Sequence, residues 1–430
     1  MVSLSVTLVL FLLALLVPIF LGIPLVYAIG LSSLILMLSP LGPPLNPEIM
    51  AVRMLRSSTN FILLAIPFYL FAGRLLTESG AVSAIFDFSQ ELVGPIRGGI
   101  AHVNVVASLL FSGMSGSAVA DAAGLGTVEY EMMNKAGYED GFSTAVIGSS
   151  AIIGPIIPPS IPLIIYGVLA EVSIGDLFLG GVIPGILMAL SLMLAIAVTA
   201  VRRGFESSDA WDLRAVVRTM VRAVPAIMTI ALIIGGIVTG VFTATEAGAV
   251  AVIWALGVGV FVYGDLDLET FLEVSYESAI DVGELLVILA SAAIYAFVVT
   301  AAGIPGLLVE VLVGTGFGAT GSLLLIVLAL LFLGMVLDPI TNLILVVPVI
   351  APSFPQLGID PLHAGVVIVL TLMIGLLTPP FGAVLFVLEK VTDVSIEHIS
   401  RSIVPFYLPL VLIVLLLIVF PGLVTFIPTL

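Results

Sequence analysis

The sequence contains no cysteine and few charged residues. Without cysteine, the chain can form neither disulfide bonds nor metal sites with thiolate ligands. Only 9% of its residues are charged and 61% are hydrophobic, whereas a typical soluble domain has roughly 25% charged residues. This composition excludes an ordinary soluble domain and indicates an all-α polytopic membrane protein.

Positive charge is especially scarce. The chain has 12 Lys and Arg against 28 Asp and Glu, a net charge of −16, which argues against a nucleic-acid partner. The phosphate-binding motif GxxxxGK[ST] does not occur in the sequence, so we do not expect ATP hydrolysis by this chain. The histidines His102, His363 and His398 lack metal-ligand spacing, and we expect packed or interfacial side chains there.

Long apolar windows recur along the whole chain. They lie at about 4–40, 61–77, 143–170, 177–201, 223–241, 246–263, 284–302, 321–350, 363–388 and 403–428. A membrane helix needs about 20 apolar residues, so the longest windows have room for two passes or a hairpin. No convincing cleavage site follows the first window, and we predict that it also spans the membrane.

The few basic residues orient the chain, because Lys and Arg concentrate on the cytoplasmic side. We predict that the following are cytoplasmic: Arg97, Lys135, Arg202, Arg203, Arg214, Arg218, Arg222, Lys390 and Arg401. The connections 171–176, 303–320 and 351–362 contain no Lys or Arg and then lie outside. Arg53 and Arg56 do not fit this scheme, and they lie either on an interfacial helix or against a partner subunit.

A proline-containing motif occurs twice. In the first half, "GMSGSAVAD" begins at Gly113 and a proline pair begins at Pro158; in the second half, "GMVLDPITN" begins at Gly334 and a pair begins at Pro379. Both separations are 45 residues, and two further glycine pairs keep the offset of 221 between the halves. Because the connection in only one unit carries a lysine, the two units are predicted to form an inverted-topology repeat, as in many secondary transporters.

The proline pairs predict two discontinuous helices, with breaks at 154–162 and 375–382. Proline in a helix interior costs about 3 kcal/mol relative to alanine. Interrupted helices are tolerated at membrane depth only where the freed backbone is buried in protein or lines a cavity. Matched breaks therefore predict a binding site near the membrane midplane. The alternative is that the prolines only kink helices for packing.

Two re-entrant hairpins are predicted before the breaks, at about 100–130 and about 320–350. The first groups serines among glycines and alanines, which indicates either a Na⁺ site with hydroxyl ligands or a close helix interface. Asp338 belongs to the second hairpin and Asp121 to the first. Each is either functional, as intramembrane carboxylates usually are, or it caps a half-helix or faces water at a hairpin tip.

Two other features concern connections. Glu246 begins an apolar span, and we predict that it caps the first turn, although binding to a partner is the alternative. The stretch 265–278 alternates acidic and apolar residues and predicts an amphipathic arm on the cytoplasmic face, either linking two moving domains or connecting them passively. The predicted segments are N-terminal scaffold helices (1–60), repeat 1 (61–176), scaffold helices with a cytoplasmic connection (177–263), arm and repeat 2 (264–402), and a C-terminal span (403–430).

Six segments resemble the large membrane subunit of the tripartite ATP-independent periplasmic (TRAP) transporters. They are "SGMSGSAVADAAGLG", "IGPIIPPSIPLIIYG", "VFTATEAGAVAV", "LGMVLDPITNLILVVPVIAP", "LGIDPLHAGVVIVLTLMIGLLTPPFGAVLFV" and "FPGLVTFIPTL". The resemblance runs from residue 21 to the C-terminus, with the segments in the family's order. Ala244 departs from it, because proline is usual there.

The resemblance implies an elevator-type fold similar to the ion transporter superfamily, in which a transport domain slides against a scaffold. It also implies Na⁺ symport of an organic anion, such as a C4-dicarboxylate, sugar acid, sialic acid or 2-oxo acid. The implied partners are a periplasmic substrate-binding protein and a small four-helix membrane subunit in a bacterial or archaeal inner membrane.

The resemblance further implies two or more Na⁺ ions. The residues of the first site would be Ser112, Gly113, Ser115, Ser117, Gly154, Pro155 and Pro158. Those of the second would be Gly334, Asp338, Thr341, Gly375 and Thr378. The anion would lie near Ser160, Asn342 and Pro380, where helix N-termini favour negative charge.

Two other classes of function compete with this interpretation. An intramembrane aspartyl protease needs two carboxylates at one depth, whereas Asp121 and Asp338 lie in predicted hairpins of opposed topology. A self-sufficient Na⁺ or H⁺ carboxylate symporter would share the repeat architecture. Absolute dependence on a secreted binding protein would separate that class from a tripartite transporter.

Overall fold

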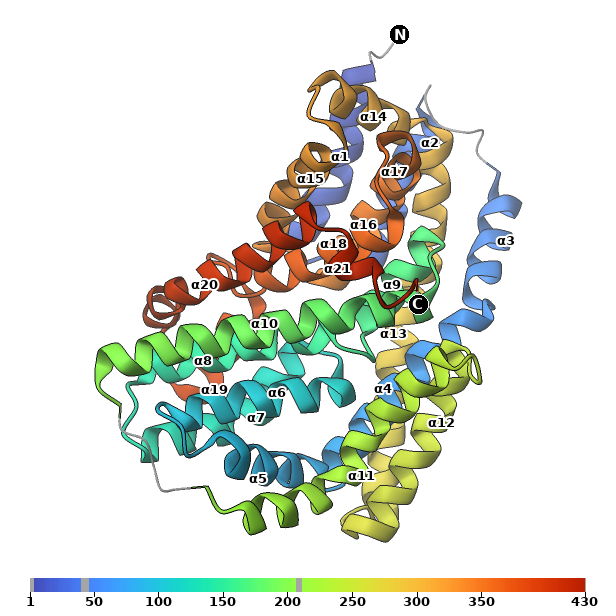
Figure 1. Ribbon diagram of the computed structural model, residues 1–430. Helices are drawn as coiled ribbons and strands as arrows, with labels where there is room; N and C mark the ends of the chain where they lie inside the picture. The colour runs from blue at the N-terminus through green and yellow to red at the C-terminus, as the bar shows by residue number, and fades with distance from the viewer. Residues whose placement is uncertain (1–3, 40–45, 206–210, 430) are drawn as a thin grey trace.

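The computed structural model describes residues 4–39, 46–205 and 211–429, except for the side chains of 4–8, 10, 47, 58 and 112–115. These residues are almost entirely helical (Figure 1). Within the described ranges, seven helices are long and apolar enough to cross a membrane, and two bent helix pairs are further candidate spans. The prediction of an all-α polytopic membrane protein is therefore confirmed.

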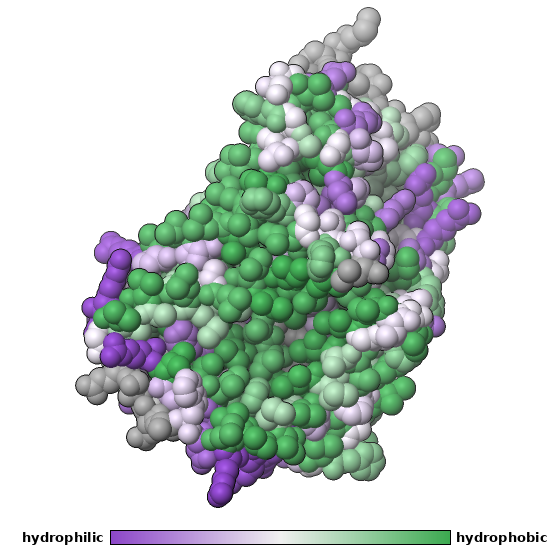
Figure 2. Space-filling model, viewed as in Figure 1, coloured by the Kyte–Doolittle hydropathy of each residue, from purple (hydrophilic) through white to green (hydrophobic). Residues whose placement is uncertain are grey.

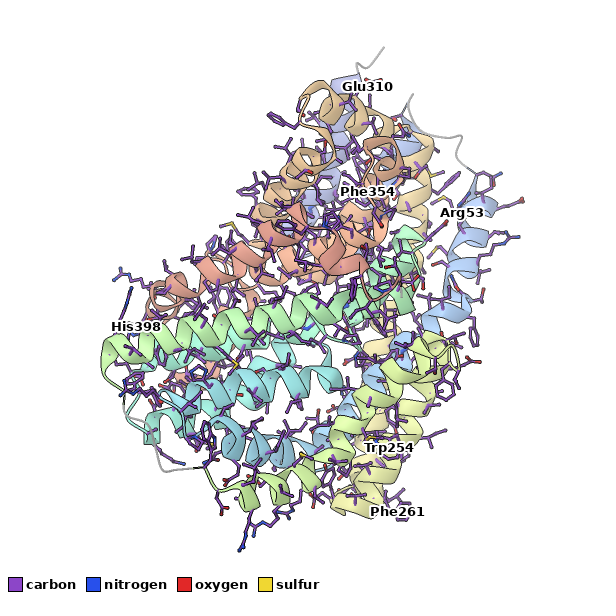
Figure 3. The ribbon with its side chains drawn as sticks, viewed as in Figure 1. Arg53, Trp254, Phe261, Glu310, Phe354 and His398 are labelled. Atoms are coloured by element: carbon purple, nitrogen blue, oxygen red, sulfur yellow. The ribbon has the colours of Figure 1, made fainter. Side chains whose placement is uncertain are left out.

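The N-terminal helices gather around one long helix, α13 (Leu268–Ala301). Helix α1 (Leu4–Phe20) packs on α2 (Leu25–Leu38), and α2 packs on α13. The amphipathic helix α3 (Pro47–Ser58) also packs on α13 and places the Arg53 guanidinium 3.8 Å from the centroid of the Phe297 ring (Figure 3). The predicted arm at 265–278 is not a separate helix, because α13 continues from it without a break.

Three further helices complete this part of the molecule: α4 (Ala65–Glu78), α11 (Leu213–Val238) and α12 (Ala244–Gly257). Helix α4 packs between α12 and α13. The indole nitrogen of Trp254 donates a hydrogen bond to the Pro225 carbonyl at 2.9 Å, which ties α12 to α11. Glu246 forms a capping box with Thr243 at the start of α12, so the predicted capping role is confirmed.

The first hairpin follows α5 (Ala81–Val93) and consists of α6 (Gly99–Ser115) and α7 (Ala118–Lys135). It is followed by α8 (Asp140–Ala151) and α9 (Ile161–Ala170), which are bent by 42° at the intervening break. Helix α7 packs on α8, and α6 packs on both.

The second hairpin consists of α15 (Gly318–Gly334) and α16 (Pro339–Ile350). Before it lies α14 (Ile304–Gly314), which meets α15 at 116°. After it come the short α17 (Phe354–Leu357) and the pair α18 (Pro361–Gly375) and α19 (Ala383–Thr392).

Two long helices cross the molecule between the hairpins: α10 (Ile174–Arg203) and α20 (Ile396–Val419). In Figure 1, α6 and α7 appear below α10, whereas α15 and α16 appear above it. A final short helix, α21 (Gly422–Thr425), packs on α10 and α18. Figure 2 shows hydrophobic side chains over most of the visible face and hydrophilic ones gathered at its edges, as expected of a molecule surrounded by lipid.

Candidate substrate and ion site

The tip of the first hairpin packs directly on the first break. Gly116 joins α6 to α7 with φ +59°, and a Cβ there would lie 2.9 Å from the carbonyl oxygen of Pro159. Glycine is needed at this position for both its left-handed conformation and the close approach of the two backbones. The next residue, Ser117, caps α7 by accepting a hydrogen bond from the Ala120 amide at 3.3 Å.

The first break is entirely buried, from residue 152 to residue 160. Its serine, Ser160, caps α9 by accepting from the Leu163 amide at 3.2 Å, and its hydroxyl donates to the Pro155 carbonyl. The residues predicted from this break, Gly154, Pro155 and Pro158, are therefore in a dry region. Because buried polar groups are costly when unsatisfied, the Ser160 hydroxyl stabilises both sides of the interruption.

At the second break the contact is between two glycines. A Cβ on Gly375 would lie 2.7 Å from the Cα of Gly334, so the end of α15 touches the end of α18 backbone to backbone. Thr378 follows, and its hydroxyl donates to the Ile374 carbonyl at 2.8 Å. The sequence-predicted pair Gly334 and Gly375 is thus in direct contact. Like the Pro158–Pro159 bond in the first break, the Pro379–Pro380 bond in the second is cis.

The N-terminus of α16 carries a carboxylate. Asp338 accepts a hydrogen bond from the Thr341 amide at 3.0 Å, and the Thr341 hydroxyl also donates to it. Asn342 is buried and donates to the carbonyls of Leu337 and Asp338 at 2.9 and 3.1 Å. Its side-chain oxygen has no hydrogen-bond partner among the described atoms. The capping interpretation of Asp338 is therefore correct, and the side-chain oxygen of Asn342 beside it is a buried acceptor.

Part of the first predicted Na⁺ site lies outside the described side chains, namely Ser112, Gly113 and Ser115. Asp121 lies in the first turn of α7 and is buried. Among the residues that the structure describes, no group of three or more His, Asp or Glu side chains is placed to hold a metal ion.

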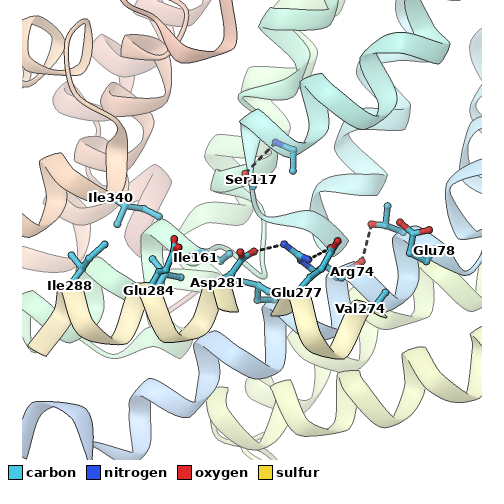
Figure 4. Close-up of a pocket in the computed structure, with 15 residues that line it drawn as sticks. Arg74, Glu78, Ser117, Ile161, Val274, Glu277, Asp281, Glu284, Ile288 and Ile340 are labelled. Atoms are coloured by element: carbon cyan, nitrogen blue, oxygen red, sulfur yellow. Dashed lines mark hydrogen bonds and ion pairs between the residues drawn. The ribbon is translucent and has the colours of Figure 1, made fainter. Parts of the chain in front are cut away.

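A cavity of about 490 Å³ lies where three helix N-termini meet (Figure 4). Its walls include Ser117 and Ala120 at the start of α7, Ile161 at the start of α9, and Ile340 at the start of α16. Helix N-termini present free amide hydrogens and a partial positive charge, and so favour anions. This wall, which we call the helix-end wall, contains no charged side chain among these four residues.

The opposite wall of the cavity is charged and comes from α4 and α13. Arg74 forms ion pairs with Glu277 and Asp281, as the dashed lines in Figure 4 mark. Glu78 and Glu284 also line the cavity. We call Arg74, Glu78, Glu277, Asp281 and Glu284 the charged wall. None of them was predicted as a site residue from the sequence, although Glu277 lies in the predicted arm at 265–278 and acidic residues three or four apart along 273–284 form a detectable stripe.

None of the three residues predicted for the anion is among the described residues that line this cavity. Ser160 directly precedes the lining residue Ile161, and Asn342 follows Ile340 by two positions, so both are buried just behind the helix-end wall. Pro380 is exposed on the second break and does not belong to this cavity. The structure therefore groups Ser160 and Asn342 with the cavity and separates Pro380 from it.

Comparisons with a family model and with known proteins all indicate the same transporter family. Residues 12–423 match the family model of the DctM component of tripartite ATP-independent periplasmic transporters. The chain is 40% identical over 380 residues to the sialic acid TRAP transporter large permease protein SiaM of Vibrio cholerae, covering 88% of this chain and 89% of that protein. It is 34% identical to the C4-dicarboxylate TRAP transporter large permease protein DctM of Pseudomonas aeruginosa, covering 93% and 92%.

A solved structure shares the fold. The YdaH transporter of Alcanivorax borkumensis superposes with a TM-score of 0.61 over 87% of each chain, at 16% sequence identity.

Proposed function

Because the chain belongs to the DctM family of large permeases of tripartite ATP-independent periplasmic transporters, we propose that it imports an organic anion by Na⁺ symport. As a family member with several apolar spans, it is a multi-pass protein of the bacterial inner membrane. The two relatives described above are a sialic acid permease and a C4-dicarboxylate permease, so the proposed cargo is a carboxylate of one of these classes.

The convergence of three helix N-termini on one cavity is the observation that carries this proposal. Such ends stabilise negative charge without a fixed cation, which allows a carboxylate to bind and leave. The volume of about 490 Å³ is in the range of small-molecule sites, roughly 300–1,000 Å³.

Na⁺ would bind where each hairpin meets its break. The first place is between Ser117 and the Pro155–Pro158 segment; the second is among Asp338, Thr341, Gly375 and Thr378. Freed carbonyls at interrupted helices and nearby hydroxyls are hard oxygen ligands, and Asp338 supplies a charge at the second place. Binding of both ions beside the anion would couple the two transport steps.

The proposed movement is an elevator. The body that moves would contain the two hairpins and two broken helices as an inverted repeat, and α1–α4 with α11–α13 would form the scaffold. The position of the cavity between α4 and α13 on one side and three half-helix ends on the other supports this division. A periplasmic binding protein would deliver the anion, and a small four-helix membrane subunit would complete the complex.

Uptake by reconstituted vesicles tests the proposal. Proteoliposomes containing this chain and its small subunit are supplied with labelled sialic acid, succinate, a sugar acid or a 2-oxo acid, with and without an inward Na⁺ gradient and the cognate binding protein. Uptake that requires both supports the proposal and identifies the anion class. Uptake that needs Na⁺ but no binding protein would instead identify a self-sufficient symporter, and absence of Na⁺ dependence would refute symport.

A further inference from the structure

The charged wall is an unusual lining for a cavity that accepts an anion. Among the described lining residues, Arg74 is the one basic side chain, and it faces four carboxylates: Glu78, Glu277, Asp281 and Glu284. The formal charge of the lining is therefore −3. An anion on the helix-end wall experiences repulsion across the cavity, because a cleft with low-dielectric walls focuses the field of its charges.

Arg74 is held by two acidic partners on α13. One terminal guanidinium nitrogen donates to Glu277 and the other to Asp281, and these acids stand one helical turn apart on α13. The planar guanidinium normally binds a carboxylate through two parallel hydrogen bonds. Here each terminal nitrogen already donates one hydrogen bond, to Glu277 or to Asp281, and these two carboxylates offset the positive charge that a cargo carboxylate would meet at Arg74.

The charged wall lies toward the predicted cytoplasmic side. Just after α4 ends, Gly80 packs closely on the carboxylate of Asp265, in the connection that leads into α13. Just before this connection, at the end of the helical segment that continues α12, the Tyr263 hydroxyl donates to the Arg222 carbonyl at 2.8 Å. Arg222 belongs to the basic cluster that the positive-inside rule assigns to the cytoplasm.

We propose that Glu277 and Asp281 sequester Arg74 so that the anion is released to the cytoplasm instead of being retained there. The inference rests on the proposed anion transport, and it assigns to these acids a positioning role that acts through Arg74. With the charge of Arg74 offset by its partners, no other basic side chain among the described lining residues is available to the anion, which relies on the helix-end wall and the proposed Na⁺ ions. The arrangement lowers the affinity of the cavity for the anion when it faces the cytoplasm.

Removing the charges of the two acidic partners is the direct test. The E277Q/D281N double variant keeps the size of both side chains but frees the guanidinium. Proteoliposomes are loaded with increasing unlabelled anion, and initial uptake of the labelled anion is started by adding the binding protein outside, which selects correctly oriented molecules. The anion is labelled sialic acid, or labelled succinate where the uptake panel selects it. The measured quantity is the internal concentration that halves uptake.

We expect this half-inhibiting concentration to fall about tenfold in E277Q/D281N, the change given by one charge-assisted hydrogen bond to the cargo. Adding R74Q to the double variant should restore it to within about twofold of wild type. The single variants E277Q and D281N should each give a smaller fall, and they supply the test if the double variant does not fold. The matched control is E131Q/E139Q, which removes two exposed carboxylates from the ion pairs with Lys135 and Arg203, outside this cavity.

Three results would overturn the inference. An unchanged half-inhibiting concentration in folded E277Q/D281N overturns it while leaving anion import intact. A fall that persists after R74Q is added shows that bulk charge acts, not sequestration of Arg74. Wild-type vesicles that take up no anion refute the proposed function and the inference together.

Discussion

The two broken helices share a plan but differ in charge and access. The first break is buried throughout residues 152–160, and its cap is the hydroxyl of Ser160. The second is partly exposed at residues 378–381, its following helix starts without a side-chain cap, and the adjacent hairpin brings Asp338. Two ion sites at these places, as proposed, would therefore not be equivalent, because the first would have neutral ligands away from solvent and the second would have a carboxylate near solvent.

The largest effect is expected from Gly375→Ala. The added methyl group would meet the Gly334 backbone at 2.7 Å, and backbone cannot rotate away. Overpacking of this kind typically costs about 1–3 kcal/mol, and here it also separates hairpin and break, so we expect uptake to be abolished and the melting temperature to fall. Gly124→Ala is the control, since its Cβ would meet nothing within 4 Å. Normal Na⁺-driven uptake by Gly375→Ala would show that the glycine contact is dispensable.

The next largest effect is expected from Asp338→Asn, which tests the charge difference between the two proposed ion sites. In Asp338→Asn the side chain still caps α16, since Asn is as good an N-cap as Asp, but the negative charge is lost. We expect the Na⁺ concentration for half-maximal uptake to rise at least about tenfold, as loss of a close charge to an ion implies. Asp360→Asn changes the same kind of cap on α18 and should leave Na⁺ dependence unaltered. Equal Na⁺ dependence in the two variants would remove Asp338 from the ion site.

A smaller effect is expected from Ser160→Ala in the first break. The variant loses the cap on α9, a change worth about 1 kcal/mol of stability, and leaves the buried Leu163 amide without its acceptor. Ser173→Ala removes an equivalent cap from α10, where the amide is exposed. Melting temperatures of the two variants should therefore differ, with Ser160→Ala lower. If the two melting temperatures fall equally, burial of the first break does not increase the cost of losing its helix cap.

The smallest effect is expected from Thr378→Ala. Its hydroxyl donates to the Ile374 carbonyl in the last turn of α18 at 2.8 Å. The variant loses this local hydrogen bond and, in the proposed site, one oxygen ligand near the second break. We expect a rise of about threefold in the half-maximal Na⁺ concentration, consistent with one neutral ligand. Thr371→Ala removes the same kind of hydroxyl from the body of α18, before the break, and should leave the half-maximal Na⁺ concentration unchanged. Indistinguishable uptake curves would exclude Thr378 as a ligand.

Much of this architecture could be predicted from local patterns. Proline and glycine disturb a helix wherever they occur, so spacing alone pointed to the interruptions between α8 and α9 and between α18 and α19. Hydroxyl and carboxylate caps are local as well, as the capping box of Glu246 illustrates. Which glycine contacts which, however, depends on how hairpins fold back, and the sequence only suggested that Gly334 and Gly375 belong together.

The charged wall could not be predicted, for a different physical reason. Arg74 and its partners Glu277 and Asp281 are about 200 residues apart in sequence and meet only when α4 packs on α13. The stripe of acids on α13 suggested an amphipathic surface segment, which is what such a pattern usually forms. Arg74 lies near the end of an apolar span. This lone arginine was the sequence feature that could have indicated a partner for the acidic stripe.

The length of α13 has a consequence for the surrounding bilayer. A helix of 34 residues extends about 51 Å at 1.5 Å per residue, whereas the hydrocarbon layer is about 30 Å thick. The helix must therefore tilt or project beyond the lipid tails. The extent of tilt or projection sets the depth of the Arg74 ion pairs relative to the headgroups. If cargo is released at the charged wall, as proposed, hydrophobic mismatch would link acyl-chain length to the depth of that release, and the thickness of the host membrane would become a variable of transport.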